Sequence, residues 1–151
     1  MKIEQLISPL DNRYNDKIAD LATNFSESNL NKVRFEIEIE WLIFLCSKGG
    51  KNFPALSKPN IKNLLALKNS FDEKSAKKIK SIESKTNHDV KAVEYFIRDE
   101  LKKSSSLKRY EHLVHFALTS EDVNSLSYAI LMRDAQIIYL KQLDVIIKEL
   151  N

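Results

Sequence analysis

Glycine and proline are confined to the first 59 of the 151 residues, at Gly49, Gly50, Pro9, Pro54 and Pro59. Because these two residue types interrupt helices most strongly, the remainder of the chain can form long unbroken ones. Its segments are rich in Leu, Lys, Glu, Ala and Ile, and 43% of all residues are hydrophobic, which is enough for a core. The sequence therefore predicts a globular, all-α protein.

The longest helical pattern runs through residues 120–150. Its apolar positions are Val123, Leu126, Ile130, Ile137, Ile138, Leu143, Ile146, Ile147 and Leu150. A helix of this length extends about 45 Å. Because its apolar residues occupy more than one side, it belongs in a helical bundle, and this chain has too few other helices to cover it. We expect other subunits or further sequence to pack there.

Four shorter helices are predicted before it. The first begins near Ser26 and ends at the two glycines, and the second is capped by Ser57 with Pro59 in its first turn. Residues 74–83 form the third, and the fourth follows residue 89 and ends at the serines of 104–106. Residues 1–25 show turn chemistry and little periodicity, so we expect an irregular loop there.

Two of these helices have a clear apolar face. In the first helix the predicted core positions are Leu30, Val33, Ile37, Trp41 and Leu45. In the fourth helix they are Val90, Val93, Phe96, Ile97 and Leu101.

The charge pattern gives one alternative function. Net charge is +3, from 24 basic and 21 acidic residues, and the signs alternate except in the lysine-rich residues 74–85. That stretch could bind a nucleic-acid backbone, but it carries neither aromatic residues nor a reading motif, so a solvated helix face is favoured. We expect no nucleic-acid partner.

The single cysteine, Cys46, lies within an apolar run and has no second cysteine to pair with. It is predicted to be a core residue in a reducing compartment. The sequence has neither a membrane-spanning apolar run nor a signal-type N-terminus, which together predict a cytoplasmic protein.

A triplet of polar residues, Asn87, His88 and Asp89, stands directly before a helical segment. A histidine between an amide and a carboxylate has its orientation under local control, and the first N–H groups of the helix attract anions. The triplet could equally be a polar helix cap. Both interpretations stay open on the residues alone.

A second polar group precedes the longest helix, where Thr119 and Ser120 stand at its expected start. Their hydroxyls could cap the helix or, with its N–H groups, bind a carboxylate. His112 and His115 are three residues apart, so we expect them to share a helix face. With no Cys nearby and no His-Glu-x-x-His pattern, no metal site is predicted.

Three motifs, taken in order, resemble one known family. Residues 8–14 read Ser-Pro-Leu-Asp-Asn-Arg-Tyr, residues 86–95 begin Thr-Asn-His-Asp, and residues 115–122 read His-Phe-Ala-Leu-Thr-Ser-Glu-Asp. This combination resembles the bacterial adenylosuccinate lyases of the fumarase/aspartase superfamily, and the likeness runs from Ile7 to the end. It implies a homotetramer around a central helical bundle, with an N-terminal helical domain over 1–110 and the truncated start of the bundle domain over 111–151.

The resemblance also implies roles for particular residues. Arg13 and Tyr14 match the pair that lies at the substrate's phosphate, which a guanidinium suits well. Thr119 and Ser120 match a pair that binds a carboxylate of the succinyl group. The implied small-molecule substrates are adenylosuccinate and a succinylated carboxamide ribotide, with no cofactor.

The other residues implied by the resemblance are histidines and their neighbours. Asn87, His88 and Asp89 would line the substrate, with His88 as a charge-stabilising donor. His115 matches a further active-site histidine that orients its neighbours.

The reaction implied is a β-elimination that releases fumarate. In the family the general acid is a His in a Thr-His-Gly-Gln-type motif and the base is a Ser on a flexible loop, and neither motif occurs before Asn151. We therefore expect this chain to be an N-terminal fragment that is inactive when isolated. A non-catalytic helical interaction module is the alternative. Fumarase, aspartase and argininosuccinate lyase are the nearest enzymatic rivals, but their substrates carry no phosphate.

Overall fold

The computed structural model describes residues 8, 10 and 13–150. The elements in chain order are η3 (Asn15–Lys17), α1 (Ala19–Phe25), α2 (Glu27–Lys48), η4 (Gly50–Asn52), α3 (Lys58–Lys68), α4 (Glu73–Thr86), α5 (Asp89–Lys102), η5 (Lys108–Leu113) and α6 (Ser120–Leu150). No β-strand occurs in these residues, and the predicted all-α fold is confirmed. Within them, no helix is both long enough and apolar enough to cross a membrane.

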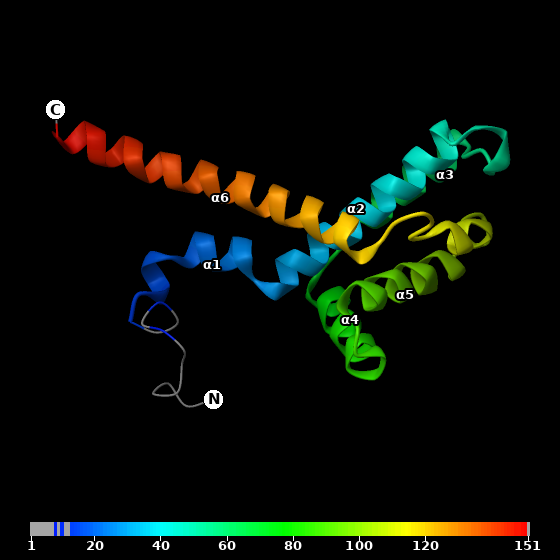
Figure 1. Cartoon of the computed structure of the whole chain (residues 1–151), viewed down its shortest axis with the longest axis horizontal. Helices are drawn as coiled ribbons and strands as arrows, with labels where there is room; N and C mark the ends of the chain where they lie inside the picture. The colour runs from blue at the N-terminus through cyan, green and yellow to red at the C-terminus, as the bar shows by residue number, and fades with distance from the viewer. Residues whose placement is uncertain (1–7, 9, 11–12, 151) are drawn as a thin grey trace.

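Helix α2 is the centre of the arrangement. It contacts α1, α3, α4, α5 and α6, and the last of these runs from the middle of the molecule to a free end far from the other helices (Figure 1). Helix α1 lies beside α6 and is tied to it by the Asn24 side chain, whose Nδ2 donates to the Leu131 carbonyl at 2.8 Å. The boundary expected after residue 110 falls inside η5.

The ends of the predicted helices agree closely with the structure. The Ser26 hydroxyl caps α2 by accepting from the Asn29 N–H at 3.1 Å, and Ser57 caps α3 in the same way through Asn60. Helix α2 ends before Gly49, where a Cβ would lie 2.5 Å from the Leu45 carbonyl oxygen, so the chain can turn there only with glycine.

The loop predicted over residues 1–25 is wrong for residues 15–17 and 19–25. Residues 15–17 form a 3₁₀ turn and residues 19–25 form α1, while residues 1–7, 9, 11 and 12 lie outside the described part of the chain. Helix α1 is stabilised by its packing against α2 and α6, which no local pattern reveals.

The core lies between α2, α3, α4, α5 and η5, and all five predicted core positions of α5 are buried. The predicted face of α2 is only partly right. Val33 and Leu45 are buried, but Leu30, Ile37 and Trp41 are half-buried. Neighbouring helices surround α2 on several sides, so its buried sector also takes in the charged side chains of Arg34 and Glu38. Cys46 is buried as predicted, and burial raises the pKa of its thiol.

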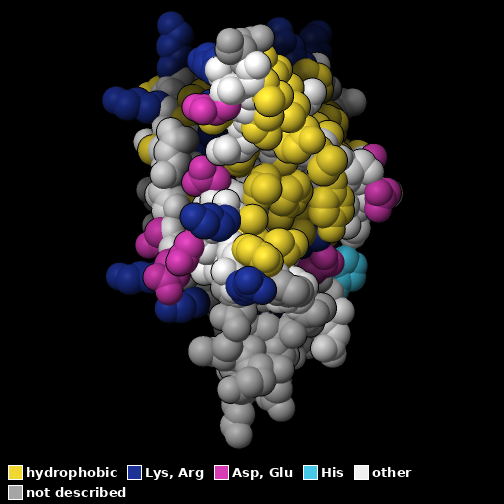
Figure 2. Space-filling view, turned by 90° about the vertical axis from the view of Figure 1, so that its left-hand side faces the viewer, with side chains coloured by type: hydrophobic (Ala, Val, Ile, Leu, Met, Phe, Trp, Pro, Cys, Tyr) yellow, Lys and Arg dark blue, Asp and Glu magenta, His cyan; other side chains and the backbone are white. Residues whose placement is uncertain are grey.

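Helix α6 is buried only in its first third, at Val123, Ser127 and Leu131. Beyond them Ile138 and Leu143 are half-buried, and most of the other large hydrophobic side chains are exposed. The exposed ones are Met132, Ile137, Tyr139, Leu140, Val145, Ile146, Ile147 and Leu150. Figure 2, which faces the end of the molecule where α6 finishes, shows hydrophobic side chains gathered in one patch. As expected, the chain leaves much of its longest helix without neighbours.

Candidate functional site

The Asn87-His88-Asp89 triplet forms the sharp reversal between α4 and α5. Asn87 ends α4 in the left-handed conformation (φ 51°), which asparagine tolerates better than most residues. His88 then caps α5, with its Nδ1 accepting from the Lys91 N–H at 3.3 Å. A neutral ring that accepts at Nδ1 carries its proton on Nε2, so the half-exposed imidazole presents an N–H donor on its other side.

Asp89 is held by a buried cation. Its Oδ2 accepts from Arg34 Nη2 at 2.6 Å and its Oδ1 accepts from the Val90 N–H at 2.8 Å. Arg34 also donates to the side-chain oxygens of Asn124, at 2.9 Å, and Asn31, at 3.3 Å. Partial burial raises the pKa of Asp89, but the Val90 N–H and the guanidinium outweigh it and lower the pKa below its usual value. Asp89 is therefore a carboxylate at neutral pH.

These groups border a polar hollow of about 450 Å³ between α2, α4, α5 and α6. Its lining residues are Glu27, Leu30, Arg34, Glu83, Asn87, His88, Asp89 and Tyr128. The whole predicted triplet thus faces one cavity, together with a tyrosine from the long helix.

Thr119 forms a capping box with Asp122 at the start of α6. The Thr119 N–H and hydroxyl both donate to Asp122 Oδ2, at 2.7 and 2.8 Å, and the Asp122 N–H donates back to the hydroxyl at 3.4 Å. The Thr119 backbone and side-chain bonds lower the pKa of Asp122. The cap interpretation is therefore realised for Thr119, whereas the structure assigns no partner to the Ser120 hydroxyl within the described residues.

His115 does not share a helix face with His112, and that prediction is wrong. His115 has φ 62° and lies in an irregular turn after η5, because Glu38 of α2 binds it there. The His115 N–H donates to Glu38 Oε2 at 3.1 Å and its Nδ1 lies 2.5 Å from Oε1. The hydrogen bond to Glu38 raises the pKa of His115, against the opposing effect of burial.

The structure connects two of the three motifs. Arg34 joins Asp89 of the second motif to Asn124, which lies in the first turns of α6 just after the third. Arg13 and Tyr14 of the first motif stack on each other, 5.4 Å apart, near a hollow that Asp16 shares with Ile138 of α6. Because Ile138 is about 27 Å along the helix from its start, Arg13 and Tyr14, which come two or three residues before Asp16, lie far from Thr119 and Ser120 within one chain.

The residues missed by sequence reasoning are Arg34 and Glu38. Both are charged, sit one turn apart on α2, and are buried to 4% and 1% exposure. Arg34 and Glu38 are spaced so that they lie beside the core positions Phe35, Ile39 and Leu42 on the buried side of α2. A charge on a buried helix face requires partners, so this spacing is the feature of the sequence that could have identified them.

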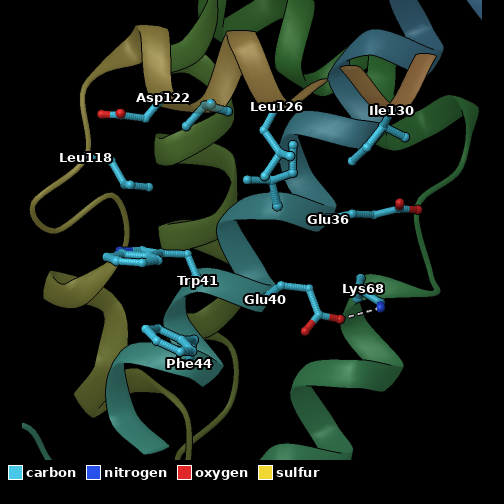
Figure 3. Close-up of a pocket in the computed structure, with 11 residues that line it drawn as sticks. Glu36, Glu40, Trp41, Phe44, Lys68, Leu118, Asp122, Leu126 and Ile130 are labelled. Carbon is cyan, nitrogen blue, oxygen red and sulfur yellow. Dashed lines mark hydrogen bonds and ion pairs between the residues drawn. The ribbon is translucent and has the colours of Figure 1, made fainter. Parts of the chain in front are cut away.

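A larger hollow of about 680 Å³ lies between α2 and α6 (Figure 3). Its walls are apolar, from Trp41, Phe44, Leu126 and Ile130, and Glu40 pairs with Lys68 at its rim. Apolar walls with acidic side chains at the rim do not suit a substrate that carries phosphate and carboxylates.

Two other expectations concern charged groups. No cluster of three or more His, Cys, Asp or Glu suited to a metal ion occurs in residues 8, 10 and 13–150. In the lysine-rich stretch, Lys77 pairs with Glu73, Lys78 with Glu100 and Lys80 with Glu27. These pairs agree with a solvated helix face.

Comparison with known proteins fits this arrangement. A family model described as "Lyase" matches residues 12–151. The chain belongs to this lyase family. The family has the helical fumarase/aspartase fold, which agrees with the packing of α2, α5 and α6.

Curated relatives within the lyases are close. The adenylosuccinate lyase of Escherichia coli (strain K12) is 43% identical over 131 residues, which is 86% of this chain and 29% of the relative. Those of Legionella pneumophila (strain Corby) and Haemophilus influenzae (strain ATCC 51907) are 42% and 41% identical, over 85% and 86% of this chain and 28% and 29% of theirs. The chain thus spans under a third of the length of these lyases, and the resemblance read from the three motifs is confirmed.

Proposed function

We propose that this chain supplies part of the substrate site of an adenylosuccinate lyase. The reaction removes fumarate from adenylosuccinate to leave AMP, and cleaves the succinylated aminoimidazole carboxamide ribotide in the same way. The observation that carries the proposal is the identity of about 40% to enzymes of this name across 86% of the chain. The polar hollow that contains the triplet supports it.

The chemistry requires three kinds of group. A base removes a proton beside a carboxylate, the electron pair forms the new C=C bond as the C–N bond breaks, and an acid protonates the leaving nitrogen. Donors must also stabilise the negative charge that develops. In the proposal His88 donates through Nε2–H, and Ser120 with the first N–H groups of α6 binds a succinyl carboxylate. Thr119 joins them when its hydroxyl turns away from Asp122.

The acid and the base are proposed to come from sequence outside these 151 residues. A single general catalyst contributes about 10²- to 10⁴-fold in rate, so a chain that lacks both has no measurable turnover by itself. Asp89, already bound to Arg34, would hold the triplet in place beside the substrate.

The proposal includes a homotetramer with shared sites. Two observations support it: the separation of Arg13 and Tyr14 from Thr119 within one chain, and the exposed hydrophobic face of α6. A second copy that packs along α6 would bring its own Arg13 to the hollow of the first. Exposed hydrophobic patches of this extent commonly mark such interfaces.

A cytoplasmic location is part of the same proposal. Cys46 is buried and unpaired, which suits a reducing compartment.

The test uses the gene product that contains this sequence. Adenylosuccinate cleavage is followed by ultraviolet absorbance for the unsubstituted protein and for Arg13→Gln. The matched control is Arg109→Gln, because Arg109 stacks on its neighbour Tyr110 at 5.5 Å just as Arg13 stacks on Tyr14. We expect Arg13→Gln to raise KM about tenfold or more, the loss of one charge-assisted contact, and Arg109→Gln to leave it unchanged. Absence of turnover in the unsubstituted protein would contradict the proposal.

A further inference from the structure

The turn that leads into α6 has an unfavourable backbone. His115 and Ala117 both have left-handed φ values, 62° and 59°, although neither is glycine. L-residues avoid this region because Cβ approaches the backbone too closely. A turn with two such residues needs contacts from elsewhere in the fold to hold it.

Helix α2 provides those contacts. Both oxygens of Glu38 bind His115, one at the backbone N–H and the other at the ring. Trp41, almost one turn later, donates from Nε1 to the Phe116 carbonyl at 2.8 Å. Figure 3 shows Trp41 on the wall of the groove that Leu118 also lines, so the turn rests on this part of α2.

Burial of the Glu38 carboxylate beside this turn is energetically unfavourable. The side chain has no exposed surface, and an ionised carboxylate in a core is strongly unfavourable unless its partners compensate. Arg34, one turn earlier, is directed to Asp89, Asn31 and Asn124 instead. The carboxylate of Glu38 is therefore committed to His115.

Other charged groups act on His115 from neighbouring elements. Glu94 and Lys91 of α5 influence it with opposite signs, and Asp122 of α6 is influenced by it in turn. Glu94 itself is occupied by ion pairs with Lys91 and Arg98, both at 2.7 Å. Glu38 is thus the one carboxylate that binds the turn directly among the described residues.

We propose that Glu38 is a positioning residue: by binding His115 it fixes the left-handed turn that directs Ser120 and the first N–H groups of α6 at a carboxylate of the substrate. Only the capping residue Thr119 separates Leu118 of this turn from Ser120. This inference rests on the proposed lyase function. It assigns the dicarboxylate half of the substrate, not the nucleotide half, to the segment that Glu38 controls.

The experiment compares Glu38→Gln with Glu94→Gln in the gene product that contains this sequence. The two residues are matched, because each is a glutamate with 1% exposure. Measurements are kcat and KM for adenylosuccinate, and inhibition constants for fumarate and for AMP. AMP lacks the dicarboxylate, so it reports on the rest of the site.

We expect Glu38→Gln to raise KM and the fumarate inhibition constant about five- to tenfold, with kcat within about twofold and the AMP constant unchanged. Glu94→Gln should lower thermal stability without this selective change. If Glu38 had a merely structural role, its replacement would weaken the binding of AMP and of fumarate alike. Equal changes in the two inhibition constants, or the same changes in Glu38→Gln and Glu94→Gln, would therefore overturn the inference.

Two further outcomes are informative. If Glu38→Gln does not fold, Trp41→Phe tests the same turn, because it keeps an aromatic ring at this position and removes the indole N–H that donates to the Phe116 carbonyl. It should weaken fumarate binding about two- to threefold and leave AMP binding unchanged, and an unchanged fumarate inhibition constant would overturn the inference.

If the unsubstituted protein releases no fumarate, the proposed function fails and this inference fails with it. Turnover with no selective effect would overturn the positioning role alone.

Discussion

Arg34 and Asp89 are joined across 55 positions of sequence by a hydrogen bond of 2.6 Å from Nη2 to Oδ2. Their surroundings differ sharply, because the Arg34 side chain is 4% exposed and that of Asp89 is 44% exposed. One end of the pair is fixed in the core and the other end borders the polar hollow. The position of the triplet is therefore set by α2.

Replacing Arg34 with Met should lower the free energy of unfolding by about 2–3 kcal/mol. Breaking a fully buried pair costs about 3–5 kcal/mol, but Asp89 is half-exposed and water can solvate it after the change. Denaturant unfolding measures the loss. Lys77→Met, which removes an exposed ion pair with Glu73, should leave the midpoint unchanged. Equal midpoints for both variants would contradict the role given to Arg34.

Much of the fold could be predicted because its signals are local. The ends of α2, α3 and α6 follow from capping serines, glycines and the start of helical periodicity. The buried face of α5 follows from its 3.6-residue pattern. Helix α1 could not be predicted in this way, since its helical state depends on packing against α6, which begins about 100 residues later.

The candidate site was predictable in its residues but not in its connections. The triplet and the Thr119-Ser120 pair were recognised as polar groups at helix starts, and both do lie there. The Arg34 and Glu38 contacts join residues 55 to 90 positions apart, and no spacing rule links such distant positions. Helical spacing predicts His112 and His115 on one helix face, because a periodic pattern carries no information about the bond from His115 to Glu38.

Stability should fall as pH rises through the raised pKa of His115. Its pKa is raised in the folded state, so its contribution is fully present below the unfolded value of about 6.5 and is lost as pH rises through the folded pKa. His115→Asn should flatten this fall, since asparagine tolerates the left-handed turn but does not titrate. Urea midpoints at several pH values between 6 and 9 measure the effect. His112→Asn, in an exposed position, should keep the slope of the unsubstituted protein.

Ala117→Gly should stabilise the chain. Ala117 is exposed with φ 59°, where an L-residue is disfavoured by about 1–2 kcal/mol and glycine is not. Glycine has more entropy than alanine in the unfolded chain, which offsets part of this relief, so we expect a net gain of about 0.5–1 kcal/mol in unfolding free energy. The control is Ala129→Gly, which is exposed within α6 and should cost about 1 kcal/mol. Thermal unfolding distinguishes the two, and a loss of stability in both would show that the turn is not strained.

Thr119→Val should lower the unfolding free energy by about 1 kcal/mol, because valine keeps the shape but loses the hydroxyl that caps α6. Thr119→Ser retains the hydroxyl and should be close to the unsubstituted protein. Denaturant unfolding of both variants tests the cap, and fumarate inhibition of the gene product tests the proposed ligand role. Since the hydroxyl donates to Asp122 in this structure, a carboxylate must compete with Asp122 for it. Thr119→Val should therefore raise the fumarate inhibition constant less than Ser120→Ala does. The reverse order would mean that Thr119 is the main ligand of the carboxylate.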